Sequence, residues 1–251
     1  MSGKRVYRKE LNSERLTSFR VTVKETDLWI AVNSASYDQQ LPQLIEQYVW
    51  GLRRQLEQYL AAEPAFAAAL GLYLVGDNAP PIAREMAVAA NRVGVGPMAA
   101  VAGAFAQSVG LELLNCSPEV IVENGGDVFL KVDAPVLVGI HAGSSALSDK
   151  LALQVDPEQT PLGVCTSSGS VGPSYSAGKA DAAVVVAESA SLADAAATAL
   201  GNSVSGPEDL EKAFSFMPEV EGICGGLLIY ADQLAAWGRI NLKKTGSLRE
   251  D

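Results

Sequence analysis

The stretch "GVCTSSGSVGPSYSAGKADAAVVVAES" covers residues 163–189 and joins two different patterns. Its first part places a cysteine, a threonine and three serines around two glycines, whereas residues 182–187 form an uninterrupted apolar run. The apolar run is short and rich in valine, which predicts a fully buried strand. The small hydroxyl residues before it can present N–H and hydroxyl donors to a phosphate or carboxylate. The same composition is typical of a flexible surface loop, so both interpretations stay open.

The patterns on either side of this stretch indicate an α+β fold with a mostly antiparallel sheet. Strands and helices come in groups rather than in strict alternation, which favours antiparallel pairing over parallel βαβ units. No linker interrupts the order, so we expect a single domain over residues 1–251. Periodicity predicts strands within 18–33 and at 120–123, 128–132, 136–140, 151–155, 182–187, 225–230 and 237–242, and helices at 41–62, 82–92, 98–114, 191–202 and 207–214.

Composition and charge exclude several classes of partner. The net charge is −10 and the basic residues are scattered, so we expect no nucleic-acid partner. The sequence has no run of about 18 apolar residues. Residues 1–30 are charged and lack the apolar segment of a secretion signal, so we expect a cytoplasmic protein with no membrane partner. The three cysteines are odd in number and form no CxxC, which predicts reduced thiols.

The segment "VIVENGGDVFL" at residues 120–130 predicts a tight hairpin with Asn124, Gly125, Gly126 and Asp127 at its turn. Paired glycines also let backbone N–H groups come close to a ligand, and Asp127 would then stand at the mouth of the site. The two interpretations are compatible, because a hairpin turn can border a pocket. We therefore take residues 124–127 as candidate binding residues.

The segment "SLADAAATALGN" at residues 191–202 is a predicted helix rich in alanine. Asp194 and Thr198 are four residues apart, so their oxygens project from one helix face, about one turn from each other. Such oxygen ligands suit a hard cation such as Mg²⁺. A structural alternative remains open, because Ser191 and Asp194 have the spacing of a capping box and Thr198 can bond back to a carbonyl. The alanines here and at 99–106 predict close packing under either interpretation.

Two residues are candidates for catalysis. Cys165 lies between an apolar run and a run of hydroxyls, so it is either a small buried side chain or a reactive thiol. A nearby Lys179 would lower the pKa of the thiol, and on this basis we expect Cys165 to be the most reactive of the three cysteines. His141 is the only histidine, so any Ser–His or Cys–His catalysis has to use it.

Four segments, taken in order, resemble the ApbE superfamily of flavin transferases: "GVGPMAAVAGAFAQ", "ENGGDVFL", "CTSSG" and "ADAAATALGN". They are similar to the family's small-residue helix start, glycine pair, TSG loop and ADALATA helix. The similarity is closest to a cytoplasmic ApbE-like branch and covers residues 90–205. It implies an ApbE-like fold of the T-fold type, with a mostly antiparallel sheet and packed helix pairs.

The resemblance also implies cofactors and residue roles. Mg²⁺ and a flavin nucleotide, FAD or FMN, would be the cofactors, and the partners would be a small-molecule ligand and an acceptor protein. The chain departs from FMN transferases by carrying "SVGPSYSAGKADA" in place of their His-Ile-x-Asp-Pro segment, and by lacking their usual export signal. By this resemblance Asp194 and Thr198 would bind Mg²⁺, Thr166, Ser167, Ser168 and Gly169 would form the flavin loop, and Gly125 and Gly126 would form the glycine pair.

The expected function is therefore binding of a phosphate-bearing small molecule with Mg²⁺, with activity like that of an FMN transferase. One alternative implied by the resemblance is a role in the assimilation of sulfide into homocysteine, in which Cys165 would act as a thiol or persulfide. A second alternative is a binding homologue without catalysis.

Overall fold

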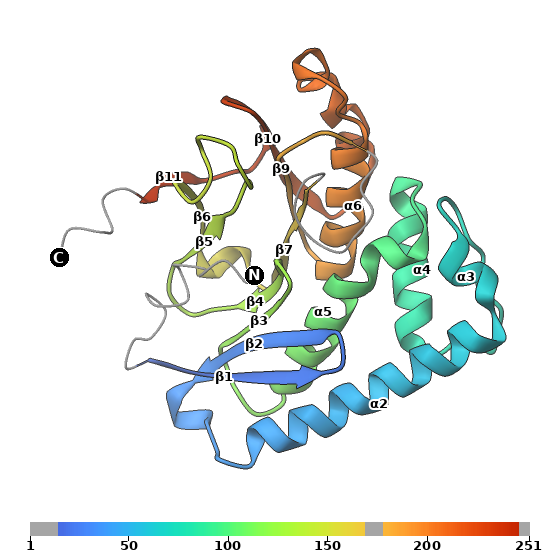
Figure 1. The fold of residues 1–251 in the computed structure, drawn as a ribbon. Helices are drawn as coiled ribbons and strands as arrows, with labels where there is room; N and C mark the ends of the chain where they lie inside the picture. Colours follow the sequence, from blue (N-terminus) through green and yellow to red (C-terminus); the bar gives the residue numbers. More distant parts are fainter. Residues whose placement is uncertain (1–14, 169–177, 246–251) are drawn as a thin grey trace.

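The computed structural model describes residues 15–168 and 178–245, which form three layers (Figure 1). Helices cover one face of an eight-stranded sheet, and a three-stranded sheet packs against the other face. Every pairing between the described strands is antiparallel. The predicted α+β class with a mostly antiparallel sheet is confirmed.

The large sheet has the strand order β1-β2-β3-β4-β7-β8-β9-β10, which follows the chain except for one excursion after β4. That excursion forms β5 and β6, which pair with each other, and β11 joins them at the C-terminal end of the described chain. The strands are β1 (Leu16–Val23), β2 (Thr26–Asn33), β3 (Val120–Asn124), β4 (Asp127–Lys131), β5 (Val136–Ile140), β6 (Leu151–Val155), β7 (Leu162–Ser167), β8 (Ala182–Ala187), β9 (Ile223–Tyr230), β10 (Gln233–Gly238) and β11 (Leu242–Lys244).

The helical layer is built by amphipathic helices whose apolar sides face the large sheet. The longest, α2 (Leu41–Ala62), buries Ile45, Val49, Leu52, Leu56 and Tyr59 of its predicted apolar stripe, whereas Leu44 is 56% exposed. Burial of such a stripe stabilises a helix far more than its intrinsic propensity does. The other helices are α3 (Pro64–Ala68), α4 (Pro81–Val93), α5 (Val101–Leu113) and α6 (Ala190–Asn202), with short 3₁₀ turns η1 (Ser34–Ser36), η2 (Pro97–Ala100), η3 (Pro157–Gln159), η4 (Pro207–Asp209) and η5 (Lys212–Glu219).

Small residues let α5, α6 and β7 approach one another closely. A Cβ added to Gly103 of α5 would lie 2.2 Å from the carbonyl oxygen of Ala190, at the start of α6. A Cβ added to Gly163 of β7 would lie 2.3 Å from the Cα of the same alanine. Real Cβ contacts are not this short, so both positions need glycine. The close packing predicted from the alanine-rich segments is confirmed, and it fixes the start of α6 against two other elements.

Three parts of the predicted secondary structure are wrong. Residues 162–167 belong to strand β7, whereas the sequence suggested a loop from residue 163 onward. The predicted helix at 207–214 is replaced by the turns η4 and η5, in which Asp209 accepts the N–H groups of Ser205 and Gly206 and Pro218 has no N–H to donate. The predicted strand at 237–242 is split at Gly238, which has φ +75° and sends the chain from β10 toward the small sheet.

Within the described ranges, no single helix has the length and apolar character needed to span a membrane. The segments Pro81–Val93 and Pro97–Leu113 meet that criterion only when they are taken together, and they are bent by 104° relative to each other.

Candidate functional site

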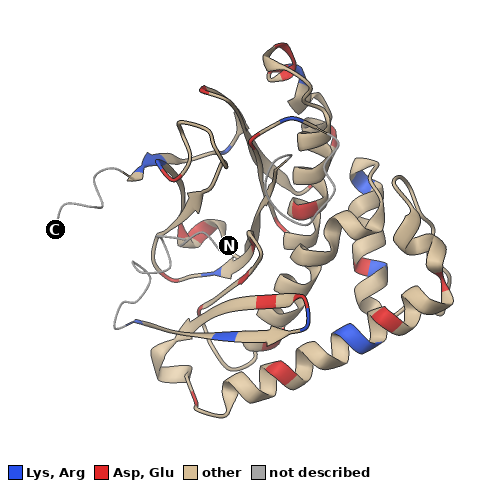
Figure 2. Cartoon of the chain, in the orientation of Figure 1, with Lys and Arg blue, Asp and Glu red and all other residues tan. Residues whose placement is uncertain are grey.

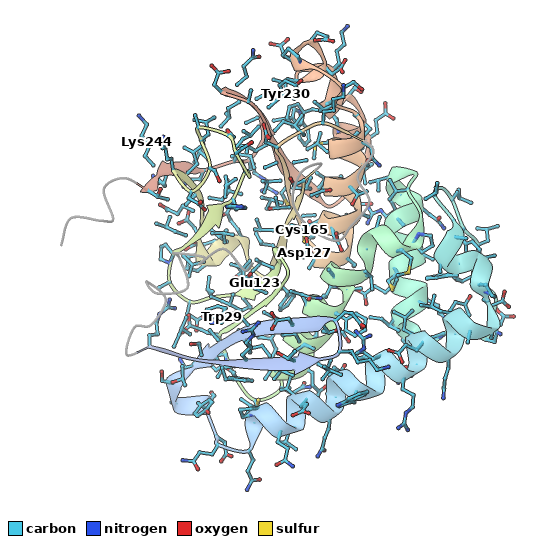
Figure 3. The ribbon with its side chains drawn as sticks, viewed as in Figure 1. Trp29, Glu123, Asp127, Cys165, Tyr230 and Lys244 are labelled. Atoms are coloured by element: carbon cyan, nitrogen blue, oxygen red, sulfur yellow. The ribbon has the colours of Figure 1, made fainter. Side chains whose placement is uncertain are left out.

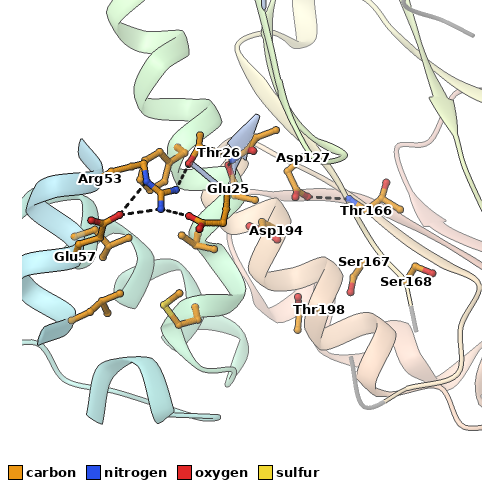
Figure 4. Close-up of a pocket in the computed structure, with 18 residues that line it drawn as sticks. Glu25, Thr26, Arg53, Glu57, Asp127, Thr166, Ser167, Ser168, Asp194 and Thr198 are labelled. Atoms are coloured by element: carbon orange, nitrogen blue, oxygen red, sulfur yellow. Dashed lines mark hydrogen bonds and ion pairs between the residues drawn. The ribbon is translucent and has the colours of Figure 1, made fainter. Parts of the chain in front are cut away.

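A cavity of about 400 Å³ opens between the helical layer and one end of the large sheet (Figure 4). One side, here called the α6 wall, is formed by the β3–β4 turn, the end of β7 and α6. The opposite side, the α2 wall, is formed by the β1–β2 turn and α2, and the start of α5 lies between them. The α6 wall contributes Asn124, Gly125, Asp127, Thr166, Ser167, Ser168, Asp194 and Thr198, the α2 wall contributes Glu25, Thr26, Arg53, Leu56, Glu57 and Leu60, and Met98, Val101, Ala102 and Phe105 complete the lining.

The α6 wall contains most of the binding residues predicted from the sequence. Three segments that are far apart in the chain meet there, namely the turn at 124–127, residues 166–168 and the Asp194–Thr198 face of α6. Gly126 belongs to the same turn but is not part of the cavity lining. Gly169 lies outside the described residues. The geometry thus brings together eight of the ten predicted binding and metal residues.

The β3–β4 turn is the predicted two-residue hairpin. Gly125 and Gly126 have φ values of 69° and 133°, which side chains disfavour, and Asn124 pairs directly with Asp127 across the turn. The side-chain amide of Asn124 donates to the carbonyl of Ala102 at 3.1 Å, which ties the turn to the start of α5. The turn therefore holds the carboxylate of Asp127 at the cavity in a fixed position.

Asp127 also connects the turn to the neighbouring strand. Its Oδ1 accepts a hydrogen bond from the backbone N–H of Thr166 at 3.3 Å, as Figure 4 shows. This contact lies where β7 reaches the cavity, immediately before Ser167 and Ser168. The carboxylate therefore helps to position the hydroxyl-rich residues beside it.

Asp194 caps a helix other than its own. Its Oδ2 accepts the N–H of Gly103 at 2.8 Å, in the first turn of α5, whose N-cap residue Ala100 makes no side-chain cap. The carboxylate thus satisfies an N–H that has no partner within α5 and lies at the positive end of that helix. The capping box considered for Ser191 and Asp194 is not formed, because Ser189 is the N-cap of α6 and accepts the N–H of Leu192 at 3.2 Å.

The charge at this wall favours a cation. Burial raises the pKa of Asp194 well above its usual value of 3.8, and the negative charge of Asp127 raises the pKa further. The N–H of Gly103 acts in the opposite direction but does not cancel these effects. A cation between the two carboxylates would relieve their repulsion, and the hydroxyl of Thr198 supplies a further hard oxygen on the same wall.

The described residues contain no group of three or more His, Cys, Asp and Glu side chains arranged to hold a metal ion. The α6 wall offers two carboxylates and hydroxyls instead. Mg²⁺ commonly binds through one or two carboxylates and completes its shell with water and substrate phosphates, so this donor set fits Mg²⁺ better than a metal held entirely by protein.

The α2 wall was not predicted, and it is organised around Arg53. The guanidinium donates to Thr26 Oγ1 at 2.7 Å and to Glu57 Oε1 at 3.0 Å, and it forms an ion pair with Glu25. The Arg53 side chain is only 14% exposed, although Glu25 is 81% and Glu57 41% exposed. The i,i+4 spacing of Arg53 and Glu57, next to the apolar stripe of α2, was the one sequence signal for this cluster.

Cys165 lies next to the site, but its environment does not favour a reactive thiolate. It is fully buried, faces α6 and donates its thiol hydrogen to the carbonyl of Ala190 at 3.3 Å. Burial raises the pKa of the thiol well above its usual value of 9.0, and the charges of Asp127 and Asp194 raise it further. Figure 3 labels Cys165 and Asp127 within the ribbon. The expectation that Lys179 lowers this pKa is therefore wrong, because burial and two carboxylates dominate.

His141 is not part of the cavity lining. It follows β5 in the small sheet, and its side chain is 47% exposed. Its Nδ1 contacts both Asp149 and Ser148 at 3.3 Å. A catalytic relay needs the acid on one ring nitrogen and the nucleophile on the other, so contacts to a single nitrogen do not form one.

Comparison with known proteins adds an independent line of evidence. The family described as "AbpE bacteria" matches residues 8–215. The UPF0280 protein of Methanocella arvoryzae is 43% identical over 193 residues, which cover 76% of this chain and 78% of that protein. The UPF0280 protein of Methanosarcina acetivorans is 40% identical over 220 residues, which cover 87% of this chain and 85% of that protein. The chain belongs to this ApbE-like family.

Solved structures agree with this family at the level of the fold. The apo flavinyl transferase ApbE of Pseudomonas stutzeri has a TM-score of 0.53 and 14% identity, covering 93% of this chain and 95% of that one. The ApbE protein of Thermotoga maritima has a TM-score of 0.54 and 14% identity, covering 93% and 98%. The predicted resemblance to ApbE-like proteins is confirmed for both family and fold.

Proposed function

We propose that this ApbE-like protein binds a flavin nucleotide together with Mg²⁺ in the cavity and transfers an FMN group to an acceptor protein. The proposal rests on one observation. The 124–127 turn, residues 166–168 and the Asp194–Thr198 face of α6 line the same cavity. The Pseudomonas stutzeri protein of similar fold is a flavinyl transferase, which supports a flavin as the ligand class.

The size and chemistry of the cavity support this ligand. A volume of about 400 Å³ lies within the range of small-molecule sites, which is roughly 300–1,000 Å³. Leu56, Leu60 and Phe105 supply apolar surface that suits a flat ring, whereas the α6 wall is polar. An acidic wall repels a bare phosphate, so binding of an anionic nucleotide there requires a cation.

The residues of the α6 wall would have different roles in binding. Asp194 and Thr198 would hold Mg²⁺, which when bound would neutralise charge on a phosphate and polarise its phosphorus–oxygen bonds. Asp127 keeps the end of β7 in place through the Thr166 N–H. The hydroxyls of Ser167 and Ser168 line the same wall and would donate to the phosphate oxygens.

The test is uptake of flavin by the purified full chain. Wild-type protein mixed with FAD and Mg²⁺ and then separated from free ligand should retain the visible absorbance of oxidised flavin. Omission of Mg²⁺, or the substitution Asp194→Asn, should abolish retention while the far-ultraviolet circular dichroism stays unchanged. Retention that is equal with and without Mg²⁺ would contradict the metal-dependent site.

Transfer is tested separately, because a binding homologue would retain flavin without reacting. Transfer of FMN from FAD breaks the phosphoanhydride bond between its FMN and AMP halves and forms one phosphoester bond to an acceptor hydroxyl, which loses its proton as AMP leaves. Incubation with candidate acceptor proteins should therefore produce AMP and an acceptor that stays fluorescent after denaturation. Bound flavin without AMP release from any tested acceptor would favour the non-catalytic alternative.

The sulfur-assimilation alternative depended on Cys165. Its buried, protonated thiol gives that role no geometric support. Brief alkylation followed by mass spectrometry should label the exposed Cys116 much faster than Cys165. Faster labelling of Cys165 would restore the thiol hypothesis.

A further inference from the structure

The segment "ALGLYLVG" at residues 69–76 connects α3 to α4 and has the side-chain pattern of a strand. Leu72 and Leu74 are 66% and 81% exposed, whereas Gly71, Tyr73 and Val75 between and beside them are partly buried. This period of two is typical of an extended chain with one face packed. The solvent-facing positions of an isolated strand are usually polar, but here they are leucines.

One edge of this segment is already occupied. The side chain of Asn91 on α4 accepts the N–H of Tyr73 at 2.8 Å and donates to its carbonyl at 2.9 Å. A neighbouring strand would make the same pair of bonds, so the amide holds the segment in a strand-like conformation.

The opposite edge is open. In an extended chain the N–H and C=O groups of residues 72 and 74 point away from those of residue 73. Within the described parts of the chain, these groups have no hydrogen-bond partner. Unpaired edges of this kind are templates for pairing with another strand.

The edge lies within an apolar and uncharged patch. Residues 64–76 contain no charged side chain in a protein whose net charge is −10, and Figure 2 draws this connection in tan. Val88 is 60% exposed and precedes Asn91 by three residues on α4, so it extends the same surface. Among the described residues, eight large apolar side chains are exposed, and four of them belong to this patch: Leu70, Leu72, Leu74 and Val88.

We propose that two copies of this protein associate through residues 70–76, which pair as antiparallel strands across a two-fold axis at Tyr73. In this register residue 72 forms a hydrogen-bonded pair with residue 74 of the partner subunit, and residue 74 pairs with residue 72. Each Leu72 then contacts Leu74 of the partner subunit on the same face. The open edge is self-complementary, because each donor and acceptor on it meets the matching group of a second copy. A two-fold interface requires this property, and a different partner would have to present an equivalent strand.

A second copy is also favoured by charge. Two strongly acidic chains repel each other over most of their surface, so they approach best where both are neutral. The paired segment is short, and interfaces of small area give weak dimers, so the dimer should be most evident at high protein concentration.

The test is sedimentation velocity of the full chain over a wide concentration range. Wild type should shift from monomer to dimer as the concentration rises. Leu72→Lys and Leu74→Glu should each weaken association by about tenfold or more, since each places a charge opposite a leucine twice per dimer. Leu111→Glu on α5 is the matched control, because that leucine is 50% exposed outside the patch and its substitution should leave association unchanged.

Mixing the two variants tests the register. In the mixed dimer the new lysine faces the new glutamate once, and the remaining Leu74 faces the remaining Leu72. The mixture should therefore dimerise more strongly than either variant alone, and circular dichroism should confirm that both variants are folded. A wild type that stays monomeric at every concentration, a dimer insensitive to both substitutions, or a mixture no stronger than its components would each overturn the proposal.

Discussion

The two walls of the cavity are built in different ways. The α6 wall is positioned by backbones in direct contact, because Gly103 and Gly163 leave no side chain between α5, β7 and the start of α6. The α2 wall is positioned by a long arginine side chain that bridges Thr26 and two glutamates. Backbone contacts leave little freedom, whereas ion-paired side chains adjust at small cost. The α6 wall is therefore suited to fixing a metal and phosphate, and the α2 wall to adapting to the rest of a ligand.

The largest expected effect compares Gly103, which packs against the start of α6 behind the α6 wall, with Gly51 on α2. Gly103→Ala should destabilise the protein by about 3 kcal/mol, because its Cβ would overlap the backbone at the start of α6. Gly51→Ala on α2 should instead stabilise by about 0.5–1 kcal/mol, since no atom lies within 4 Å of its Cβ position and alanine favours a helix. Urea unfolding measures both. Equal shifts in the same direction would contradict the difference between the walls.

The second comparison concerns the metal. Mg²⁺ should raise the melting temperature of wild type, and at one hundred times its dissociation constant the stabilisation would be about 2.7 kcal/mol. Asp194→Asn should abolish this increase but keep the cap on Gly103, since the asparagine oxygen can still accept that N–H. Glu57→Gln on the α2 wall is the control and should keep the full response. Loss of the Mg²⁺ response in both variants would mean that Mg²⁺ binding is not confined to the α6 wall.

The third prediction is a smaller loss of stability and concerns Arg53 in the α2 wall. Arg53→Gln removes two ion pairs, one of which is to the largely exposed Glu25, so the expected loss of stability is about 1 kcal/mol. The difference from wild type should shrink at high salt, whereas the Gly103→Ala effect should not. Urea unfolding at two salt concentrations separates these cases, and an Arg53→Gln loss that does not depend on salt would point to packing instead.

The smallest effect lies behind the α6 wall, where Glu85 joins three helices. Its Oε1 accepts from Gln107 at 2.7 Å and from Ser191 at 2.9 Å, and burial raises its pKa above the usual 4.5. The folded state therefore holds this proton more tightly than the unfolded state does. The contribution of Glu85 to stability should fall as the pH rises from the unfolded pKa through the folded one.

Glu85→Gln should remove this fall and keep both hydrogen bonds, because its amide oxygen accepts like the carboxyl. The free energy of unfolding, measured from acidic to neutral pH, should decline less steeply in the variant than in wild type. Parallel profiles for the two proteins would show that Glu85 titrates alike in the folded and unfolded states.

The sequence predicted the α6 wall better than the α2 wall for a physical reason. Asp194 and Thr198 share a helix face at fixed spacing, and the Gly125–Gly126 pair marks a turn, so local rules place these residues within their own elements. That these elements form one site was implied by the resemblance to the ApbE superfamily. Arg53 meets Glu25 and Thr26 only because α2 packs beside the β1–β2 hairpin. That contact joins residues far apart in the chain, and periodicity carries no information about it.

Cys165 illustrates a different limit of sequence reasoning. Its neighbours place it between an apolar run and a run of hydroxyls, but which side of β7 the thiol occupies decides its chemistry. The strand turns Cys165 toward α6, against the Ala190 carbonyl, and toward two carboxylates rather than a lysine. A shift of one residue along a strand reverses the facing of a side chain, so position in the sequence alone does not fix reactivity.

The path of the chain between β4 and β7 has a consequence for how this protein can vary. The two strands are direct neighbours, with Leu130 opposite Leu162, so residues 132–161 leave the large sheet and return to the same place. In evolutionary terms this excursion has the topology of an insertion, since its removal would not interrupt the ladder. Loss of the excursion would expose the apolar face of the large sheet that the small sheet covers, which includes Ile121 and Leu130. The small sheet can therefore change freely in length and outer sequence as long as its inner surface stays apolar.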